Sequence, residues 1–291
     1  TEFKGLRPSP VKINTNYDLL EEDRTIYPMM FMARSVSLDQ SNYDLRNLGR
    51  LSSVKDQGPN GSCWAFATYS SAESVLLPKE SLDFSEKSLR NNHGFDWSPD
   101  EGGNLSMATA YLARWSGPVL EKDDPYDIYG YNSPKNLPRA KDLNKVIYYP
   151  SKKDALSTQK IIKKAIMDYG AVYSPISYDN YFLNKRTFAH YDTRSANPNH
   201  AVTIVGWDDN YSRRNFLNLP PRNGAWLVKN SFGTKWGMGG FYWVSYYDKQ
   251  IANDAAVFVM GDIVPYQKIY QYDELGFSTS IGYGETGYFA N

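Results

Sequence analysis

A single cysteine, Cys63, restricts the fold of this 291-residue chain more than any other feature of its sequence. One thiol forms no disulfide within the chain and supplies no metal site built from several cysteines. The fold must therefore be stabilised by packing, for which the 41% of hydrophobic residues, with 24 Tyr and 7 Trp among them, are ample. A lone thiol is either a small buried hydrophobe or a nucleophile, and its neighbours in the sequence decide which.

The charge and hydropathy of the chain exclude several classes of partner. Its 32 basic and 32 acidic residues give a formal net charge of zero, which provides no overall attraction for nucleic acid or anionic lipid. The mean hydropathy is −0.57, and the longest apolar runs, such as residues 201–207, fall far short of the ~20 residues that cross a bilayer. We therefore expect a soluble protein with no nucleic-acid partner and no transmembrane segment.

Two periodicities divide the chain into a helical part and a sheet part. Helices are predicted at residues 62–77, 85–91, 105–115 and 158–169 from their apolar patterns and from N-cap, glycine and proline signals. Runs rich in Val, Ile, Tyr, Phe and Trp predict strands at residues 171–177, 200–207, 224–229, 240–247 and 255–260. Helices followed by strands indicate an α+β fold. Residues 1–40 are expected to wrap over the surface, and residues 262–291 to add short strands.

Cys63 lies at the start of the first predicted helix, in the segment Val-Lys-Asp-Gln-Gly-Pro-Asn-Gly-Ser-Cys-Trp-Ala-Phe at residues 54–66. The first turn of a helix presents unpaired backbone N–H groups and the positive end of the helix dipole, both of which favour thiolate over thiol. Gly58 and Gly61 let the backbone turn sharply and let a substrate approach closely. The position therefore favours a nucleophile.

A thiolate nucleophile needs a base that later protonates the leaving group, and histidine suits this role near neutral pH. His200 begins a predicted strand, which would hold the imidazole at a fixed angle. Asn230 follows among aromatic residues, and we expect its amide oxygen to accept a hydrogen bond from the imidazole Nδ1–H and set the tautomer. His93 and His190 lack a ligand-spaced partner and are expected at the surface or in turns, so no metal site is predicted.

In this order and spacing the chain resembles the papain family of cysteine peptidases, over residues from about 43 to about 260. His200 follows Cys63 by 137 residues, inside the window of about 130–150 residues typical of the family, whereas Asn230 follows by 167. An extended hairpin tip at residues 208–223 explains the longer second interval, because length is tolerated there.

The resemblance implies a role for each matching residue. Cys63 would be the nucleophile, His200 the acid and base, and Asn230 the residue that orients the imidazole. Gln57, six residues before the nucleophile, and the backbone N–H of Cys63 would stabilise the oxyanion. The implied fold is two-lobed, with a helical left lobe, a β-barrel-like right lobe and the active-site cleft between them.

The resemblance also implies a division of the chain into domains. The peptidase domain would cover residues 41–261, with the helical lobe at about 45–145 and the sheet lobe at about 146–261. Residues 1–40 would be an N-terminal extension, either the remnant of a pro-segment that crosses the cleft or a permanent flank. Residues 262–291 would be a C-terminal extension that begins a β-rich, lectin-like module.

A glycine loop at residues 100–104 is similar to the loop beside the family's substrate cleft. By that resemblance, residues of this loop and of the opposite wall would bind substrate, with a small-to-medium apolar side chain in the second subsite. The residues concerned are Gly102, Gly103, Asn104 and Leu105, with Pro198 and Asn199 opposite and Pro175 at the floor.

The chain departs from the family pattern at three positions. The cysteine usually found three residues before the nucleophile is Asn60, and the other disulfide partners are absent, an expected loss of about 2–4 kcal/mol per bridge. The tryptophan commonly found two residues after the orienting asparagine is Phe232, which can still screen the His–Asn hydrogen bond from water. Family members have a tryptophan near the N-terminus of the mature protein, and this chain has Leu45 at that position.

Both ends of the chain are similar to segments that flank the peptidase domain in secreted or surface-attached peptidases of anaerobic bacteria and archaea. The matching segments are residues 5–11, Gly-Leu-Arg-Pro-Ser-Pro-Val, and residues 269–276. In those proteins a lectin-like β domain follows. The resemblance therefore implies a secreted or cell-surface protein, attached to the cell wall or surface through regions outside this chain.

These observations predict a cysteine endopeptidase that uses a thiolate–imidazolium pair and a thioester intermediate, acts on extracellular or cell-surface proteins and requires no cofactor. One alternative is a catalytically silent adhesion or binding module on the same scaffold, since a fold does not guarantee activity. Another is a transpeptidase, in which an amine instead of water resolves the thioester. Active-site titration distinguishes the endopeptidase from the silent module, and analysis of the products distinguishes it from the transpeptidase.

Overall fold

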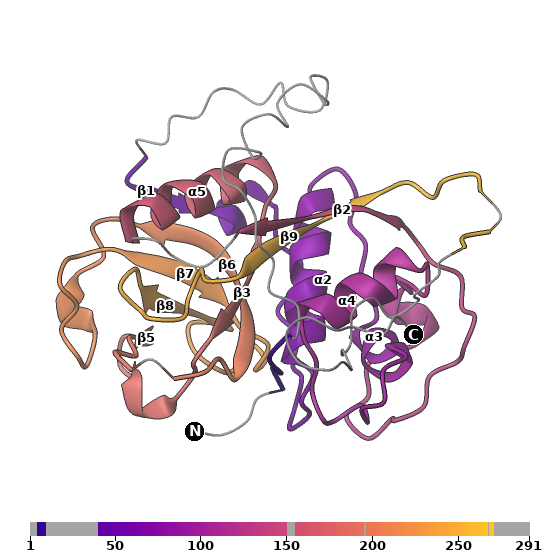
Figure 1. Cartoon of the computed structure of the whole chain (residues 1–291). Coiled ribbons are helices and arrows are strands. Elements are labelled where there is room, and N and C mark those ends of the chain that lie inside the picture. The colour runs from indigo at the N-terminus through magenta and orange to yellow at the C-terminus, as the bar shows by residue number, and fades with distance from the viewer. Residues whose placement is uncertain (1–4, 10–39, 150–154, 195, 267, 271–291) are drawn as a thin grey trace, which may run out of the picture.

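The computed structural model describes residues 5–9, 40–149, 155–194, 196–266 and 268–270. A helical lobe and a sheet lobe lie side by side, with α2 between them (Figure 1). The α-helices are α2 (Cys63–Leu76), α3 (Glu86–Asn92), α4 (Leu105–Ala113) and α5 (Ala155–Asp168), and short 3₁₀ helices are η2 (Leu45–Leu48), η3 (Glu121–Asp123), η4 (Asn180–Phe182) and η5 (Arg213–Asn215).

All nine strands of the described residues join one sheet. In chain order they are β1 (Asn42–Asp44), β2 (Asp142–Tyr149), β3 (Val172–Ile176), β4 (Leu183–Asn184), β5 (Ala189–His190), β6 (His200–Asp208), β7 (Ala225–Lys229), β8 (Phe241–Ser245) and β9 (Ala255–Gly261). The order across the sheet is β2-β9-β3-β6-β7-β8-β5-β4, and β1 pairs with β6. The fold is therefore α+β, with a helical lobe and a sheet lobe, as predicted.

Helix α2 positions the site because it is buried on nearly all sides. Thirteen of its fourteen residues are buried, and it packs on β6, β9 and β3 of the sheet lobe and on α3 and α4 of the helical lobe. A helix that is apolar all round belongs in a core, not at a surface. Pro78 follows the helix and cannot continue it.

Strand β6 holds the other half of the site. It is antiparallel to β3 on one side and to β7 on the other, with His200 opposite Ile176 and Thr203 opposite Lys229. Its residues from His200 to Trp207 are all buried. Strong β-formers buried on both faces explain why the run has no polar alternation.

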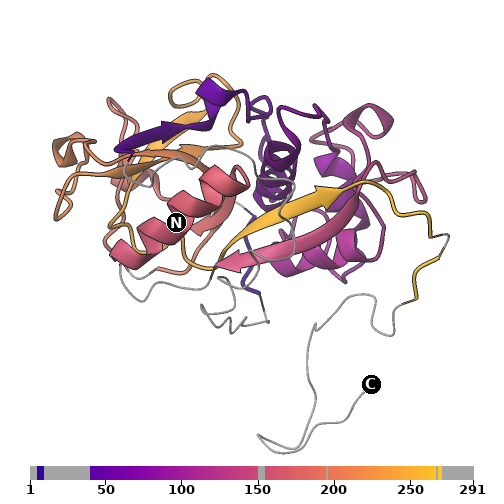
Figure 2. The same ribbon diagram turned by 90° about the horizontal axis from the view of Figure 1, so that it is seen from above.

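The predicted helices and strands are confirmed, with small shifts at their ends; the helix predicted at 105–115, for example, ends at Ala113. The sequence interpretation missed β2, which pairs with β9 from Asp142–Gly261 to Tyr149–Ala255. Figure 2 shows this pair extending from the sheet toward the helical lobe, where β2 contacts α4 and β9 contacts α2. Strand β2 depends on its partner, because it carries mixed residues that give no clear period of two.

The two predicted extensions lie largely outside the described residues. Residues 5–9 run between the lobes instead of over the surface, with Leu6 buried. Within 262–270, the described residues form no strand, and 271–291 lie outside the described part. No helix in the described ranges is long and apolar enough to cross a membrane.

Candidate active site

Cys63 is the first residue of α2 and is fully buried, in a cluster that includes Trp64, Tyr173 and Ala201. The side chain of Ser62, the N-cap residue, does not cap the helix; its hydroxyl pairs with the Tyr126 hydroxyl at 2.8 Å. The positive end of the helix is therefore not neutralised by its own cap residue. The dipole of α2 favours the thiolate form of Cys63, whereas burial among apolar side chains favours the thiol.

His200 and Asn230 form a buried hydrogen bond on the sheet lobe. Imidazole Nε2 and amide Oδ1 are 2.8 Å apart, and both residues are at most 3% exposed. An amide oxygen only accepts, so Nε2 carries a hydrogen and Nδ1 is the nitrogen that gains and loses a proton. The expected pairing through Nδ1–H was therefore wrong: β6 and the Asn230 segment meet the ring from the Nε2 side.

Aromatic side chains surround this hydrogen bond. Phe232 stacks on the His200 ring at 4.9 Å between centroids with an interplanar angle of 21°. Tyr178 meets the same ring edge-on at 5.8 Å, and Trp236 packs against both Phe232 and Tyr178. The predicted screening by Phe232 therefore fits the structure.

Gln57 is buried beside the Asn230 segment. Its Nε2 donates to the Asn60 carbonyl at 2.7 Å, and its Oε1 accepts from the Ser231 hydroxyl at 2.7 Å. Its backbone N–H also donates to the Ser231 carbonyl at 2.9 Å. An amide nitrogen has two hydrogens, so Gln57 Nε2 can donate to more than one oxygen.

Ser231 was missed by the sequence interpretation. It lies directly after Asn230, and both its hydroxyl and its carbonyl are hydrogen-bonded to Gln57, so it holds Asn230 and Gln57 close together. The contacts of Asp56 with Phe232 and of the Gly233 N–H with the Lys55 carbonyl extend this pairing. Only its position beside Asn230 pointed to Ser231, because the contact spans 174 residues.

Residues 5–9, here called the strap, lie between the two lobes (Figure 1), and Gly5 contacts Gly61, two residues before Cys63. The Leu6 N–H donates to the Asn199 carbonyl of the sheet lobe at 3.3 Å. On the helical lobe, the Gly103 N–H donates to the Gly5 carbonyl at 2.9 Å, and Gly103 accepts from the Arg7 N–H at 2.8 Å. The predicted walls of the substrate site, the glycine loop and Asn199, thus lie on either side of one extended segment.

Gly5 passes directly against the backbone before the nucleophile. Its φ is +109°, and a Cβ added there would lie 2.2 Å from the Gly61 carbonyl carbon. Glycine permits both this conformation and this approach. Gly5 therefore contacts the backbone at Gly61, which precedes Cys63 by two residues.

The other predicted substrate-binding residues stay predictions. Asn104 is the N-cap of α4 and also donates to the Pro8 carbonyl of the strap at 3.3 Å. Leu105 follows at the start of α4, and Pro175 pairs with Ala201 in the sheet. Gly102, with a φ of +87°, precedes Gly103, and half-buried Pro198 precedes Asn199.

Comparison with known proteins identifies the family. The model of the papain family cysteine proteases matches residues 40–259. The chain belongs to the papain family.

Relatives and solved structures agree with this assignment. The viral cathepsin of Bombyx mori nuclear polyhedrosis virus is 34% identical over 208 residues, covering 69% of this chain and 58% of that protein. A structure of the clostridial cysteine protease Cwp84 after propeptide cleavage matches with a TM-score of 0.73 and 33% identity, covering 82% of this chain and 63% of that one. A second Cwp84 structure, from a surface layer associated protein of Clostridium difficile, includes a lectin-like domain and matches with a TM-score of 0.72 and 33% identity, covering 81% of this chain and 55% of that one. The chain thus spans less than two thirds of these proteins.

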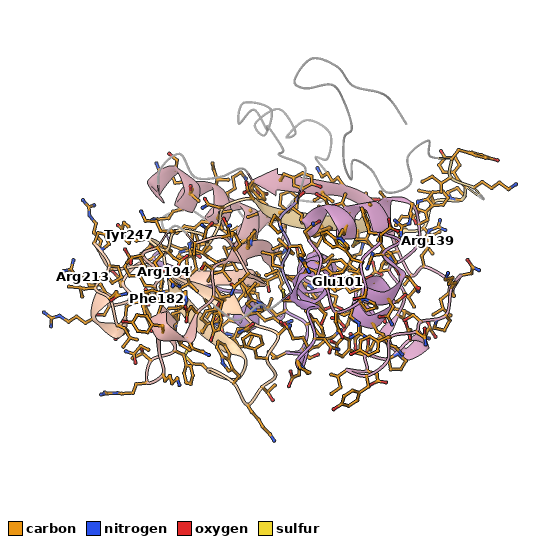
Figure 3. All side chains as sticks on the ribbon, turned by 60° about the horizontal axis from the view of Figure 1, so that its bottom comes forward. Glu101, Arg139, Phe182, Arg194, Arg213 and Tyr247 are labelled. Atoms are coloured by element: carbon orange, nitrogen blue, oxygen red, sulfur yellow. The ribbon has the colours of Figure 1, made fainter. Side chains whose placement is uncertain are left out.

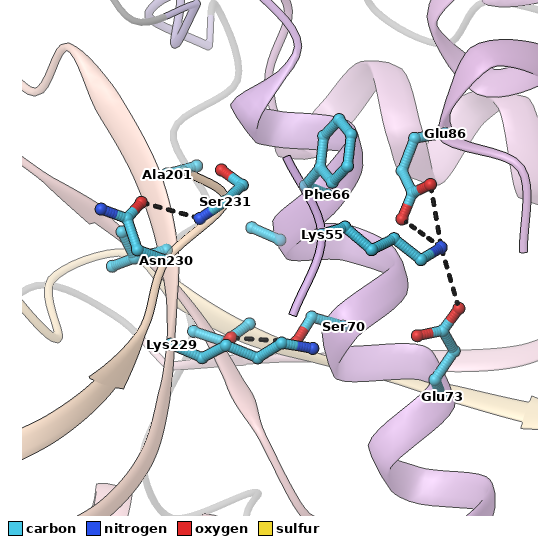
Figure 4. Close-up of a pocket in the computed structure, with 12 residues that line it drawn as sticks. Lys55, Phe66, Ser70, Glu73, Glu86, Ala201, Lys229, Asn230 and Ser231 are labelled. Atoms are coloured by element: carbon cyan, nitrogen blue, oxygen red, sulfur yellow. Dashed lines mark hydrogen bonds and ion pairs between the residues drawn. The ribbon is translucent and has the colours of Figure 1, made fainter. Parts of the chain in front are cut away.

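The papain-family site has a pocket behind it, between α2 and strands β6 and β7 (Figure 4). Lys55 is paired there with Glu86 at 2.8 Å and lies 3.8 Å from Glu73, as the dashed lines in Figure 4 mark. Lys229, directly before Asn230, donates to the carbonyl and hydroxyl oxygens of Ser52. Burial lowers the pKa of Lys229 to about 8, although nearby carboxylates such as Glu73 oppose the shift.

Two of the chain's three histidines are not where they were expected. His190 lies in β5, fully buried, with Nδ1 3.4 Å from the Asp248 carboxylate. His93 is the C-cap of α3 and 3% exposed, and burial together with the charge of Arg114 lowers its pKa to about 4. Both were predicted at the surface or in turns; tertiary packing buries His190 in a strand and His93 at a helix end. No group of three His, Cys, Asp or Glu that could hold a metal ion occurs in the described part of the chain.

Proposed function

We propose that the protein is a cysteine endopeptidase in which Cys63 attacks the substrate carbonyl. The observation that carries the proposal is the placement of Cys63 at the start of α2. This helix packs on β6, the strand that begins with His200, and His200 is hydrogen-bonded to Asn230. This arrangement combines a thiol whose anion the helix dipole favours with an imidazole whose tautomer is set.

The reaction follows from these contacts. His200 takes the thiol proton at Nδ1, and the thiolate adds to the peptide carbonyl. Gln57 Nε2 and the Cys63 N–H donate hydrogen bonds to the oxyanion and stabilise it. His200 then returns its proton to the leaving amine, and water, deprotonated by His200, hydrolyses the thioester.

The strap supports a role for residues 1–40 as part of an inhibitory pro-segment. It lies between Gly103 and Asn199, the walls that a substrate must contact, and it covers Gly61 next to the fully buried Cys63. If Leu6 marks the second subsite, as the neighbouring Asn104 and Leu105 suggest, the strap runs in the direction opposite to a substrate. Cleavage or displacement of the strap would then open the site.

We also propose a secreted or cell-surface location and extracellular protein substrates. The likeness to Cwp84, a surface layer associated protein with a lectin-like domain, supports both. On this view residues 41–261 form the peptidase domain, and residues 262–291 lead toward a further module.

Replacement of the nucleophile tests the catalytic proposal. A denatured protein is incubated with the parent chain and with Cys63→Ala, and a thiol-directed epoxide is applied to both. Because Cys63 is the chain's only thiol, labelling reports on that sulfur alone. We expect the Ala variant to lose both cleavage and labelling. Equal cleavage by the two chains contradicts the mechanism.

A further inference from the structure

The contacts of the strap also indicate which substrate side chains the site prefers. We infer that Trp97 and Glu101 form a subsite selective for a cationic side chain, three residues before the scissile bond. The inference rests on the proposed peptidase function, because it assigns a preference to that same site.

The order of strap residues defines the position of the subsite. Gly5 lies against Gly61, beside the nucleophile, and Leu6 is the buried residue between the two Gly103 hydrogen bonds. Arg7 is the next residue, and its N–H is fixed to the Gly103 carbonyl at 2.8 Å. If subsites are counted outward from Cys63, Gly5 lies at the first, Leu6 at the second and Arg7 at the third.

The Arg7 guanidinium makes two contacts with the helical lobe. Its Cζ lies 5.4 Å from the centroid of the Trp97 ring, and its Nε donates to the Glu101 carbonyl. Hydrogen bonds from Ser98 and the charge of Arg7 lower the pKa of the Glu101 carboxyl below its ordinary value. An aromatic face, a carbonyl and a carboxylate together select a planar cation.

The loop around this contact is acidic in an otherwise neutral chain. Residues 93–104, between α3 and α4, include Asp96, Asp100 and Glu101 and contain no Lys or Arg. Glu101 lies on the helical lobe near the junction with the sheet lobe, on the face that comes forward in Figure 3. The net negative charge of this loop attracts a cationic side chain and repels an acidic one.

A substrate presents its residues in the reverse order of the strap. Because subsites are counted from the scissile bond toward the substrate's N-terminus, the sequence Arg-Leu-Gly before that bond matches the contacts of Gly5, Leu6 and Arg7. The preferred substrates are therefore basic peptides with an apolar residue between the arginine and the cleavage site.

Internal competition between two peptides tests the inference. The full chain is incubated until the amount of epoxide-reactive sulfur is constant, and peptides with Arg-Leu-Gly and citrulline-Leu-Gly before the bond are then mixed in one reaction. Citrulline keeps the shape of arginine without its charge. The ratio of the two kcat/KM values is independent of how much strap still occupies the site.

We expect the arginine peptide to be preferred roughly tenfold, as an exposed cation–π contact and the charge of the nearby Glu101 carboxylate together allow. High salt should reduce the ratio. Trp97→Ala and Glu101→Gln should each lower the ratio severalfold, whereas Tyr266→Ala, which removes a 70% exposed aromatic in the C-terminal extension, should leave it unchanged. A Glu-Leu-Gly peptide should be cleaved more slowly than the citrulline peptide.

Two results overturn the inference while the peptidase proposal stands: equal rates for the arginine and citrulline peptides, or an unchanged ratio in both Trp97→Ala and Glu101→Gln. Absence of epoxide-reactive sulfur and of cleavage of every peptide contradicts the peptidase function itself, and the subsite with it.

Discussion

At the residue scale, Asn60 shows how the chain replaces a covalent bond of its family. It stands where family members have a cysteine, and its Nδ2 donates to the Ile128 carbonyl at 2.8 Å and to the Tyr126 hydroxyl at 3.4 Å. These contacts join the turn before Cys63 to a segment about 70 residues away, as a crosslink would. A hydrogen bond contributes about 0.5–1.5 kcal/mol against about 2–4 for a disulfide, so packing must provide the rest.

Asn60→Ala should destabilise the protein by about 1–3 kcal/mol, because it leaves the partly buried Ile128 carbonyl without its donor. Urea unfolding followed by far-UV circular dichroism measures the change. Asn92→Ala is a suitable control, since its amide donates to the Pro134 carbonyl at an exposed site. Equal losses in the two variants would show that the Asn60 contact has no special role.

Gln57 is the residue whose side chain is expected to act on the transition state alone. Gln57→Ala should lower kcat by roughly 10²–10³ with little change in KM. Ser231→Ala, which removes the partner of Gln57 Oε1 but keeps both oxyanion donors, should lower kcat much less. Rates per titrated active site check this, and a kcat near that of the parent in Gln57→Ala would remove Gln57 from the oxyanion site.

At the element scale, the strap and α2 are coupled through glycine backbones. The strap is held by main-chain hydrogen bonds to both lobes, which any residue could make, but its approach to Gly61 requires glycine at position 5. Helix α2 is fixed by burial on all sides and cannot yield. A side chain at position 5 must therefore displace the strap and not the helix.

Gly5→Ala should increase the rate of epoxide labelling of Cys63 about tenfold or more, because the strap would carry both a backbone clash and strain of about 1–3 kcal/mol. Labelling in the full chain is followed by mass spectrometry. Pro8→Ala changes an exposed strap residue and should leave the rate unchanged. A labelling rate in Gly5→Ala equal to the parent rate would show that the strap does not control access to the sulfur.

At the scale of the whole molecule, buried charges lie where the two lobes meet. Lys229 comes from the sheet lobe, while Glu73 and Glu86 come from α2 and α3, and all three are at most 6% exposed. Moving such groups out of water is costly, and the cost appears as a shift in pKa. The free energy of unfolding should therefore depend on pH through these buried groups.

Lys229 should make stability increase between about pH 8 and pH 10.5. Its folded pKa of about 8 lies below the ordinary 10.5, so in this window the unfolded chain holds a proton that the folded chain has lost. The free energy of unfolding then rises with pH, by about 3 kcal/mol in total from this group. The difference in unfolding free energy between the parent and Lys229→Met, measured from pH 7 to 11, isolates the effect.

Lys164→Met is the matched control, because Lys164 is an exposed lysine paired only with Asp168 within α5 among the ion pairs of the described residues. It should show the pH dependence of the parent. If the difference in unfolding free energy between the parent and Lys229→Met is constant from pH 7 to 11, Lys229 keeps its ordinary pKa.

Much of this molecule follows from residue types and local spacing. The start of α2 at Cys63, the N-cap at Ser85 and the strand from His200 were predictable because caps, proline stops and apolar periodicity act within a few residues. The chain order of nucleophile, base and orienting amide likewise predicted the papain-like fold.

Tertiary structure alone decided the rest. Which imidazole nitrogen meets Asn230, the pairing of β2 with β9, the burial of His190 and the passage of the strap over Gly61 all join residues far apart in the chain. Local sequence specifies which conformations a segment can adopt. It does not specify which distant surface will exclude water from that segment, and that exclusion is what selects these contacts.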